Sequence, residues 1–364
     1  SCYTGLRISD IQNNEFDASI MGSFVDTQLT HTLTQATKHV PFYKHAMVSP
    51  VHKIADLPII SKADIRENGD NFLADNHRGV IVSGATSGTT GTPLVIKQNM
   101  TSVVREQAFV ARHLEWAGFK PGDKRAWIRG DMIVPLNQKE GPFWRYSWFE
   151  NMIMLSSFHM SPNNLQGYID AMVNYGTQII QAYPSSIVTL AKHLDIHDQY
   201  YSGNLKSIVT SSESLSQEDK QLIEKRFGCI VFDWYGLFER VAAIGSCEHG
   251  RYHILSDYSH VELIDVGDGR HEIIGTNFNN SLQPLIRYRT GDHVYLSNET
   301  ACPCGRVFPV IDRIEGRIGD YLLGEDGQKV HILNHIPKGV TGLIATQFIQ
   351  NEPKQIEVQA VVNR

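Results

Sequence analysis

The stretch SGTTGTP, Ser87 to Pro93, combines glycines with hydroxylated residues. Glycines let a backbone approach a ligand closely, and the N–H and O–H groups of such a loop can surround phosphate oxygens. The loop is not a Walker P-loop, because that motif needs Gly-Lys-Ser/Thr and the next lysine here is Lys97. Taken alone, the stretch is equally compatible with phosphate binding and with a flexible turn.

A second group of residues has the donor atoms of a metal site. Cys247 in CEHGRYH and the pair Cys302 and Cys304 in CPC supply three thiols, and His253, or alternatively His249, supplies an imidazole. Three thiolates and one imidazole are the ligands of a tetrahedral Cys3His zinc site. The alternative is that these are reduced cysteines packed in a β-rich region.

The elements that must position these residues alternate between strand and helix patterns. A β-branched run at 80–82 and the strand-like PLVIKQ place the glycine-rich loop between two strands. A helical pattern follows at 101–118. Helix patterns then occur at 164–176, 185–194 and 216–228, and strand patterns at 121–130, 177–183, 205–212 and 229–236. This alternation is typical of a parallel sheet covered by helices.

From about Tyr252 the pattern becomes β-rich and indicates an antiparallel sheet or a small barrel. The glycines of RIEGRIGDYLLGEDGQ surround Asp320, and we place a domain boundary there. The expected fold class is α/β: a large N-terminal domain, 1–319, with helix-covered β-sheets and a small β-barrel-like region, then a truncated α+β C-terminal subdomain, 320–364, which is short for an independent domain.

Composition excludes several function classes. The 364 residues are 41% hydrophobic and 20% charged, with a formal net charge of −6, so we expect neither nucleic acid nor an anionic membrane surface as a partner. No apolar run approaches the length of a membrane span, and the N-terminus lacks a signal-peptide pattern. Five cysteines, an odd number, fit a reducing compartment. We therefore expect a soluble, cytoplasmic protein.

Five stretches, in this order, resemble motifs of the adenylate-forming superfamily, which includes acyl-CoA synthetases, peptide-synthetase adenylation domains and luciferases. The resemblance is strongest to the phenylacetate-CoA ligase and CapK-like branch and spans roughly Leu57 to Asp320. The stretches are TSGTTGTP (86–93), SSESL (211–215), DWYGLFE (233–239), LIRYRTGD (285–292) and CPCGRVFPVIDRIEGRIGD (302–320).

The resemblance implies a phosphate loop, nucleotide-binding segments, a ribose motif and an interdomain hinge. The residues that it assigns to ATP binding are Ser87, Gly88, Thr89, Thr90, Gly91, Ser212, Glu213, Tyr235, Gly236, Asp292 and Arg313. Those that it assigns to catalysis are Glu239, Thr90 and Arg313. Some members of the branch also resemble the cysteine and histidine pattern, which there looks like a structural metal site.

Each implied role has a structural alternative. Asp292 would accept hydrogen bonds from both ribose hydroxyls or be a turn aspartate. Glu239 would bind the Mg²⁺ that bridges the ATP phosphates or form a salt bridge at a helix start. Arg313 would meet the ribose or the α-phosphate or form a surface ion pair. Tyr235 would stack on adenine or belong to the core, and Asp320 would be the hinge.

Two departures from the family pattern bear on function. Phe238 stands where family members usually have threonine or serine, so a hydroxyl near the phosphate or acyl group is lost. The family also has a catalytic lysine near the end of its C-terminal domain. Lys338 and Lys354 lie too early to match that lysine, so neither is assigned its role.

The resemblance implies ATP- and Mg²⁺-dependent activation of a carboxylic acid, expected to be aromatic, as an acyl adenylate with release of pyrophosphate. The acceptor stays open between CoA, a carrier protein, an amine and a reductase. The short C-terminus resembles adenylating proteins of phenazine antibiotic (griseoluteic acid) biosynthesis, which indicates secondary metabolism. The rivals are a complete acyl-CoA ligase and a catalytically impaired nucleotide- or acid-binding relative. The aromatic stretch 141–154 is an acyl pocket or core, and His159 is unassigned.

Overall fold

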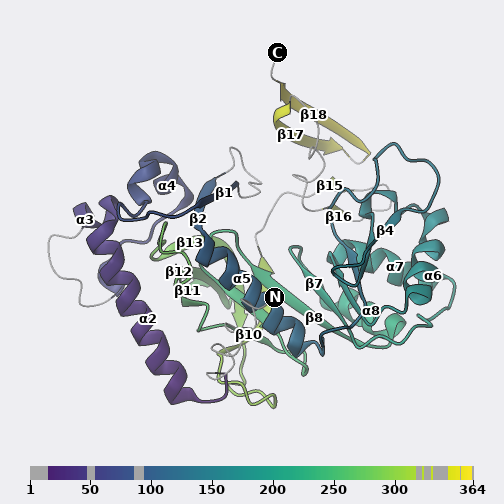
Figure 1. Cartoon of the computed structure of the whole chain (residues 1–364), viewed down its shortest axis with the longest axis horizontal. Coiled ribbons are helices and arrows are strands. Elements are labelled where there is room, and N and C mark those ends of the chain that lie inside the picture. Colours follow the sequence, from purple (N-terminus) through teal and green to yellow (C-terminus); the bar gives the residue numbers. More distant parts are fainter. Residues whose placement is uncertain are drawn as a thin grey trace.

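The computed structural model describes residues 15–46, 54–85, 94–316, 322–323, 329–330, 343–352 and 354–362. Its centre is a twelve-stranded sheet with the order β11-β12-β13-β14-β10-β9-β8-β7-β6-β3-β5-β4 (Figure 1). One half of this sheet is mainly parallel and the other half is antiparallel. The mixed α/β class predicted from the sequence is confirmed.

The parallel half is the part that the alternating pattern predicts. Neighbouring strands run parallel from β5 through β3, β6 and β7 to β8, and β4 closes the edge antiparallel to β5. The strands are β3 (Arg125–Ile128), β4 (Trp144–Ser147), β5 (Met152–Leu155), β6 (Ile179–Ala182), β7 (Ser207–Ser211) and β8 (Ile230–Gly236).

Helices cover both faces of this half. Side chains alternate between the faces of a strand, and Ile180 packs into a core with α6 (Leu165–Tyr175), α7 (Pro184–Ile196) and α8 (Gln217–Phe227). Its neighbour Ile179 packs on the other face against the end of α5 (Met100–Trp116). Burial on both faces is typical of the strands of a parallel sheet, and every residue of β6 is buried.

The antiparallel half continues the same sheet from β8. It contains β9 (Ala243–Ser246), β10 (Tyr252–Ile254), β11 (Ser259–Gly267), β12 (Arg270–Asn277), β13 (Tyr288–Leu296) and β14 (Val310–Gly316). Its neighbouring strands pair antiparallel from β8 through to β11. The antiparallel sheet expected from about Tyr252 is therefore present.

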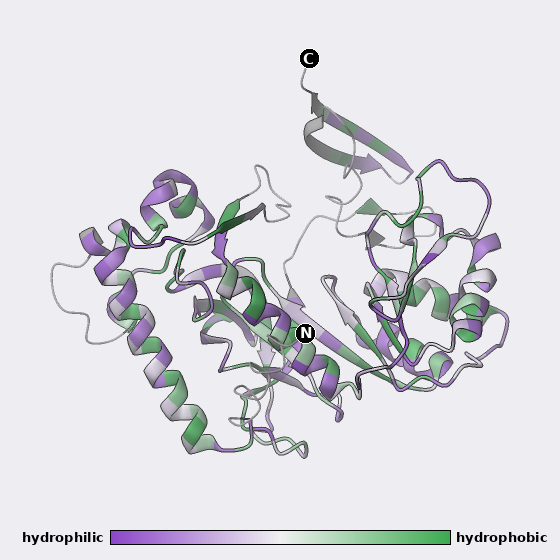
Figure 2. Ribbon diagram, viewed as in Figure 1, coloured by the Kyte–Doolittle hydropathy of each residue, from purple (hydrophilic) through white to green (hydrophobic). Residues whose placement is uncertain are grey.

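The N-terminal part packs helices and a hairpin against this half. It contains α2 (Ala18–His39), α3 (Pro41–Ala46), α4 (Lys62–Asn68), β1 (Ile81–Ala85) and β2 (Val95–Asn99). Asp17 caps α2 by accepting from the backbone N–H groups of Ser19 and Ile20. Hydrophilic and hydrophobic residues alternate along α2 (Figure 2), and its buried Met21 and Ala36 face the core.

Short 3₁₀ turns connect the larger elements, at Ile54–Asp56, Gly69–Phe72, Ser157–His159 and Pro162–Asn164. Near the C-terminus lie β15 (Leu322–Leu323) with β16 (Lys329–Val330) and the hairpin of β17 (Leu343–Glu352) and β18 (Gln355–Val362). The hinge predicted at Asp320, Lys338 and the domain boundary lie outside the described residues. Of the described helices, none is long and apolar enough to cross a bilayer.

Candidate functional site

The carboxyl ends of the parallel strands meet at one edge of the sheet. In open α/β sheets, ligands bind at this edge. Here the chain leaves β3 at Arg129, β6 at Tyr183, β7 at Ser212 and β8 at Leu237. Two of the predicted nucleotide-binding segments, SSESL and DWYGLFE, therefore end at the edge where a ligand is expected.

The hairpin of β1 and β2 packs against the end of β8. The two strands pair antiparallel, which confirms that the glycine-rich loop connects two strands. Gln98 on β2 donates to the carbonyl oxygen of Phe238 over 2.9 Å, and the Phe238 ring covers Gly84 on β1. The loop residues Ser87, Gly88, Thr89, Thr90 and Gly91 lie outside the described residues, so their predicted role stays a prediction.

The contact of Gly84 with Phe238 gives a direct test of this packing. A Cβ atom at Gly84 would lie 2.2 Å from Phe238 Cζ, so Gly84→Ala is expected to lower the free energy of unfolding by about 1–3 kcal/mol. Adding Phe238→Ala should recover part of the loss, and Gly22→Ala, where nothing lies within 4 Å, is the control. Urea unfolding measures all three, and a Gly84→Ala variant as stable as the control would contradict the contact.

Tyr235 and Asp292 meet across the sheet. Tyr235 on β8 donates its hydroxyl to Asp292 Oδ2 on β13 over 2.7 Å, although β8 and β13 are not neighbouring strands. The backbone N–H of Asp292 donates to Thr290 Oγ1 over 3.0 Å, and Asp292 is 4% exposed. The predicted adenine and ribose residues are thus brought together, and the Asp292 carboxylate is oriented by a hydroxyl donor.

Glu239 is held in a tight turn beside these two residues. Tyr288 donates its hydroxyl to Glu239 Oε1 over 2.9 Å, and Glu239 is 2% exposed. The next residue, Arg240, has a φ of 60°, a backbone conformation that is rare for non-glycine residues. Arg240 forms an ion pair with the buried Glu106 on α5 over 2.7 Å. The α5 helix therefore fixes the turn that carries Glu239.

Ser212 and Glu213 follow β7 directly. The backbone N–H and hydroxyl of Ser185, after β6, donate to the two carboxylate oxygens of Glu213 over 2.7 and 2.9 Å. Burial raises the pKa of Glu213, and the Ser185 donors and the charge of Arg129 oppose that rise. Ser212 accepts from Arg129. The two predicted residues are thus hydrogen-bonded to residues at the ends of β3 and β6, and their role in ATP binding stays a prediction.

Arg313 borders a wide cleft. The cleft has a volume of about 1990 Å³ and lies between α7, the start of α8 and β14, with Ser185, Glu213, Tyr252 and Arg313 in its wall. Arg313 forms an exposed ion pair with Asp312 over 2.9 Å and lies over the Tyr295 ring. The surface ion pair weighed as its alternative is present, and the cleft brings Arg313 to the same cavity as Glu213.

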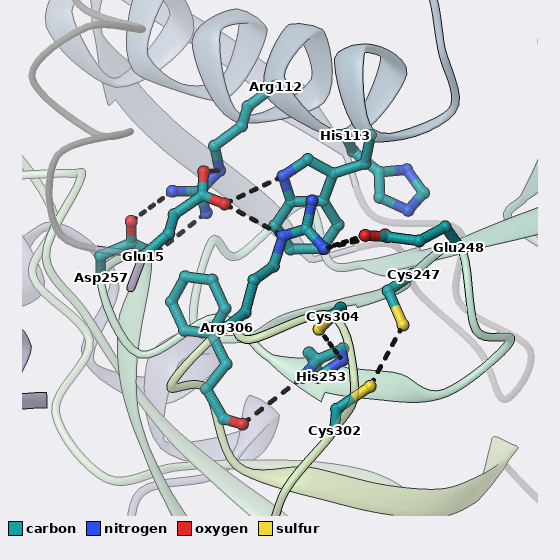
Figure 3. Close-up of polar contacts among 12 residues, drawn as sticks. Glu15, Arg112, His113, Cys247, Glu248, His253, Asp257, Cys302, Cys304 and Arg306 are labelled. Atoms are coloured by element: carbon teal, nitrogen blue, oxygen red, sulfur yellow. Dashed lines mark hydrogen bonds and ion pairs between the residues drawn. The ribbon is translucent and has the colours of Figure 1, made fainter. Parts of the chain in front are cut away.

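The cysteine and histidine residues converge at one point. Cys247, His253, Cys302 and Cys304 each offer a ligand atom, and these atoms all lie within 4.8 Å of one another (Figure 3). The Sγ atoms of Cys247 and Cys302 are 3.6 Å apart, and Cys304 Sγ is 3.5 Å from His253 Nε2. Tetrahedral zinc with Zn–S bonds near 2.3 Å separates its ligands by roughly 3.6–3.8 Å. The donor set and spacing fit zinc, whereas His249 is exposed and outside the cluster.

Two comparisons place the chain among known proteins. Protein CapK of Staphylococcus aureus is 30% identical over 316 residues, which are 86% of this chain and 70% of CapK. Phenylacetate-coenzyme A ligase of Escherichia coli (strain K12) is 27% identical over 322 residues, 81% of this chain and 71% of the ligase. The chain belongs to the adenylate-forming superfamily. No family model matches it.

Solved structures show the same superfamily fold. A crystal structure of 2-hydroxyisobutyryl-CoA ligase in complex with 2-HIB-AMP and CoA has a TM-score of 0.64 and 19% identity, and the match covers 96% of this chain and 80% of that one. An open conformation of the same ligase gives a TM-score of 0.62 with 18% identity. At this identity the likeness concerns the fold alone.

The aromatic stretch of this superfamily member divides between core and surface. Phe143, Ile153 and Leu155 belong to the core beneath α6 and α7, whereas Trp148 and Phe149 are exposed at the turn between β4 and β5. His159 stacks on Phe143 and its Nδ1 lies 2.8 Å from Ser156 Oγ. Core packing therefore accounts for part of the stretch.

Sequence reasoning missed a buried ionic network beside the cysteine cluster. Arg112 on α5 pairs with Asp257 and contacts Glu15, and Arg306 pairs with Glu15 and Glu248 (Figure 3). Arg112, Asp257 and Glu15 are at most 3% exposed. No local pattern marks these residues, because Arg112 and Asp257 are 145 residues apart in the chain.

Asp233 on β8 was also not singled out from the sequence. Thr210 and Tyr252 donate hydroxyls to its carboxylate over 2.7 and 3.1 Å. Burial raises the pKa of Asp233, and these donors oppose the rise. Because Tyr252 borders the cleft, Asp233 links the wall of the cleft to the sheet.

Proposed function

We propose that this chain is an AMP-forming ligase that activates a carboxylic acid with ATP. The observation that carries the proposal is the turn from Tyr235 to Glu239, where Asp292, Glu239 and the hairpin of the predicted phosphate loop meet at the carboxyl edge of the sheet. The names of relatives support it, because they include phenylacetate-coenzyme A ligases and 2-hydroxyisobutyryl-CoA ligase.

The proposed reaction is a displacement at phosphorus. A carboxylate oxygen of the acid attacks the α-phosphorus of ATP, the bond from that phosphorus to pyrophosphate breaks, and an acyl adenylate forms. The protein needs no covalent nucleophile, since positioning and charge stabilisation lower the barrier. Residues 87–91 would donate hydrogen bonds to the phosphates.

The residues around β8 would bind the nucleotide. Asp292 accepts the ribose hydroxyls, and Tyr235 holds its carboxylate in place. Arg313, in the wall of the cleft, would bind the ribose or the α-phosphate. Glu239 supplies the carboxylate oxygen that Mg²⁺ prefers. A Mg²⁺ ion held by Glu239 would supply positive charge to the phosphates.

The acid is proposed to be aromatic and to serve secondary metabolism, with phenazine carboxylates among the candidates. Phenylacetate-coenzyme A ligases support an aryl acid. CoA is the first acceptor to test, because the relatives are named as CoA ligases. A carrier protein or another acyl-acceptor enzyme is the alternative acceptor. With Asp320 as the hinge, the small domain that follows it would rotate between the two half-reactions.

The Cys3His cluster is proposed to hold a structural Zn²⁺. The supporting observation is the convergence of four donor atoms within 4.8 Å at the junction of β9, β10 and the loop before β14. Four protein ligands leave no open position for a substrate. The metal would cross-link these three segments and stabilise their packing. No step of the proposed reaction depends on it.

Pyrophosphate exchange tests the function. We expect acid-dependent exchange of radiolabelled pyrophosphate into MgATP with at least one of phenylacetate, benzoate, phenazine-1-carboxylate and 2-hydroxyisobutyrate. Asp292→Asn removes a charged acceptor and is expected to raise the KM for ATP about 10- to 100-fold. Asp265→Asn, an exposed substitution on β11, is the matched control.

The outcomes distinguish adenylation, CoA ligation and nucleotide binding without catalysis. Exchange without CoA establishes adenylation, and AMP release that requires CoA establishes the ligase. ATP binding by calorimetry without exchange for any acid would replace the proposal with a nucleotide-binding relative. Asp292→Asn with an unchanged KM for ATP would remove Asp292 from the site.

A further inference from the structure

Arg129 is a clamped cation at the ligand-binding edge of the sheet. It is the first residue after β3. Its guanidinium carbon lies 4.9 Å from the ring centres of both Trp127 and Tyr183. Cation–π contact with two rings holds the planar guanidinium in one orientation. The side chain is therefore pre-organised, which lowers the entropy cost of binding a ligand.

The polar contacts of Arg129 leave one buried donor of its guanidinium without an acceptor in the described part of the chain. One terminal nitrogen donates to Ser212 Oγ over 2.7 Å, but within the described part of the chain no group accepts from its buried Nε. The nearby carboxylates are bonded elsewhere: Glu213 by the two donors of Ser185, and Asp131 by the indole N–H of Trp127 over 2.6 Å. A buried N–H donor that lacks an acceptor costs free energy, and an anion bound beside it would supply the acceptor.

The backbone beside Arg129 is strained. Ser212, its hydrogen-bond partner, has a φ of 72°, a left-handed conformation that is uncommon for serine. Strain of this kind persists only when the surroundings fix it, and it gathers at ligand sites. The strained turn and the clamped cation lie at the ends of neighbouring parallel strands β7, β6 and β3, where an α/β sheet binds ligands.

We propose that Arg129 binds an oxyanion of a substrate at this edge. The inference rests on the proposed adenylation, whose two substrates both carry such oxygens: the carboxylate of the acid and the phosphates of ATP. Arginine presents several N–H donors in a plane, which suits either group. Arg129 would thereby fix one reactant relative to the other, and its loss should weaken binding of that reactant only.

Calorimetric binding tests the proposal and identifies the source of the oxyanion. The probes are MgATP, phenylacetate and benzoate, and the variants are Arg129→Gln and Arg129→Lys. We expect Arg129→Gln to weaken binding of either MgATP or the acids about 10-fold or more and to leave the other class within about twofold. Arg129→Lys keeps the charge and should recover part of the affinity. The control is Arg145→Gln, an exposed arginine that donates to the carbonyl oxygens of Pro142 and Trp144.

The outcomes separate this proposal from the proposed function. Equal affinity of wild type and Arg129→Gln for both probe classes would overturn it, as would a wild type that binds neither class. If Arg129→Gln does not fold, Arg129→Lys decides, because unchanged affinity for both classes in that variant counts against a planar donor site. Pyrophosphate exchange by the wild type is scored separately. If the wild type shows no exchange but binds a probe in an Arg129-dependent way, adenylation is rejected and the proposed oxyanion site at Arg129 is retained.

Discussion

Arg112→Met is expected to lower the free energy of unfolding by about 3–5 kcal/mol. Arg112 is 1% exposed, and its guanidinium pairs with Asp257 through both terminal nitrogens and contacts Glu15 at 3.4 Å. Removing the cation leaves Asp257 buried without its ion-pair partner at the interface of α5 with the antiparallel half, and it leaves Glu15 with Arg306 alone. Such charges cost several kcal/mol each when they are unpaired.

The pH dependence of this loss of stability distinguishes the contribution of the Arg112 charge from that of its packing contacts. Burial raises the pKa of Glu15, and the charges of Arg112 and Arg306 oppose the rise. Without Arg112 this pKa rises further. A carboxyl whose folded pKa is raised destabilises the fold increasingly as the pH rises above its unfolded pKa, and fully only above its folded pKa. The loss should therefore be smaller near about pH 5 than at about pH 7.

Urea unfolding at the two pH values measures the loss. Lys44→Met removes the cation of an exposed ion pair with Asp75, and as the matched control it should change stability little. An Arg112→Met variant no less stable than this control would show that the ion pairs of the network add no net stability. A loss that does not vary with pH would assign it to the missing side-chain contacts with Phe109 and Trp116.

The parallel half could be predicted because its signals are local. Short strand patterns such as 177–183 alternate with helical patterns, and some helix ends have their own marker. In α8, Ser216 accepts from the backbone of Asp219, and Gly228 ends the helix with a φ of 66°. These features depend on neighbours in the chain, so the sequence alone predicts them.

The candidate site was predicted as a set of residue types but not as a set of contacts. The contact of Tyr235 with Asp292 joins residues 57 apart, and that of Arg129 with Ser212 joins residues 83 apart. Such pairs depend on which strands become neighbours, which no local pattern specifies. Arg129 was missed for this reason, because an arginine after a strand carries no signal until Ser212 is placed beside it.

The cysteine cluster could be predicted in part from the sequence. The sequence supplied the three thiols and left His253 and His249 as alternatives. The structure distinguishes them because β10 pairs with both β9 and β14, which buries His253 beside Cys304 and leaves His249 in the exposed turn. Strand pairing therefore selects the histidine that the spacing could not.

Removal of the metal is expected to have the other large effect. We expect the purified chain to contain about one Zn²⁺ per molecule by mass spectrometry of metals. Cys302→Ser should abolish that content and lower the free energy of unfolding by more than about 3 kcal/mol, because metal binding to a folded site adds directly to stability. The proposed ligands come from the turn after β9, from β10 and from the loop before β14, so losing the metal should weaken the connection between these three segments.

Cys229→Ser is the matched control, since Cys229 is a free, half-buried cysteine outside the cluster. It should keep the zinc and most of the stability. A chelator such as EDTA should lower the stability of the wild type and of Cys229→Ser but leave Cys302→Ser unchanged. Because the ionic network reaches the cluster through Arg306, the chelated wild type should also lose part of the stability that Arg112 provides. Purified protein that contains no zinc and does not respond to added Zn²⁺ would instead make the four residues an ordinary packed group of reduced thiols.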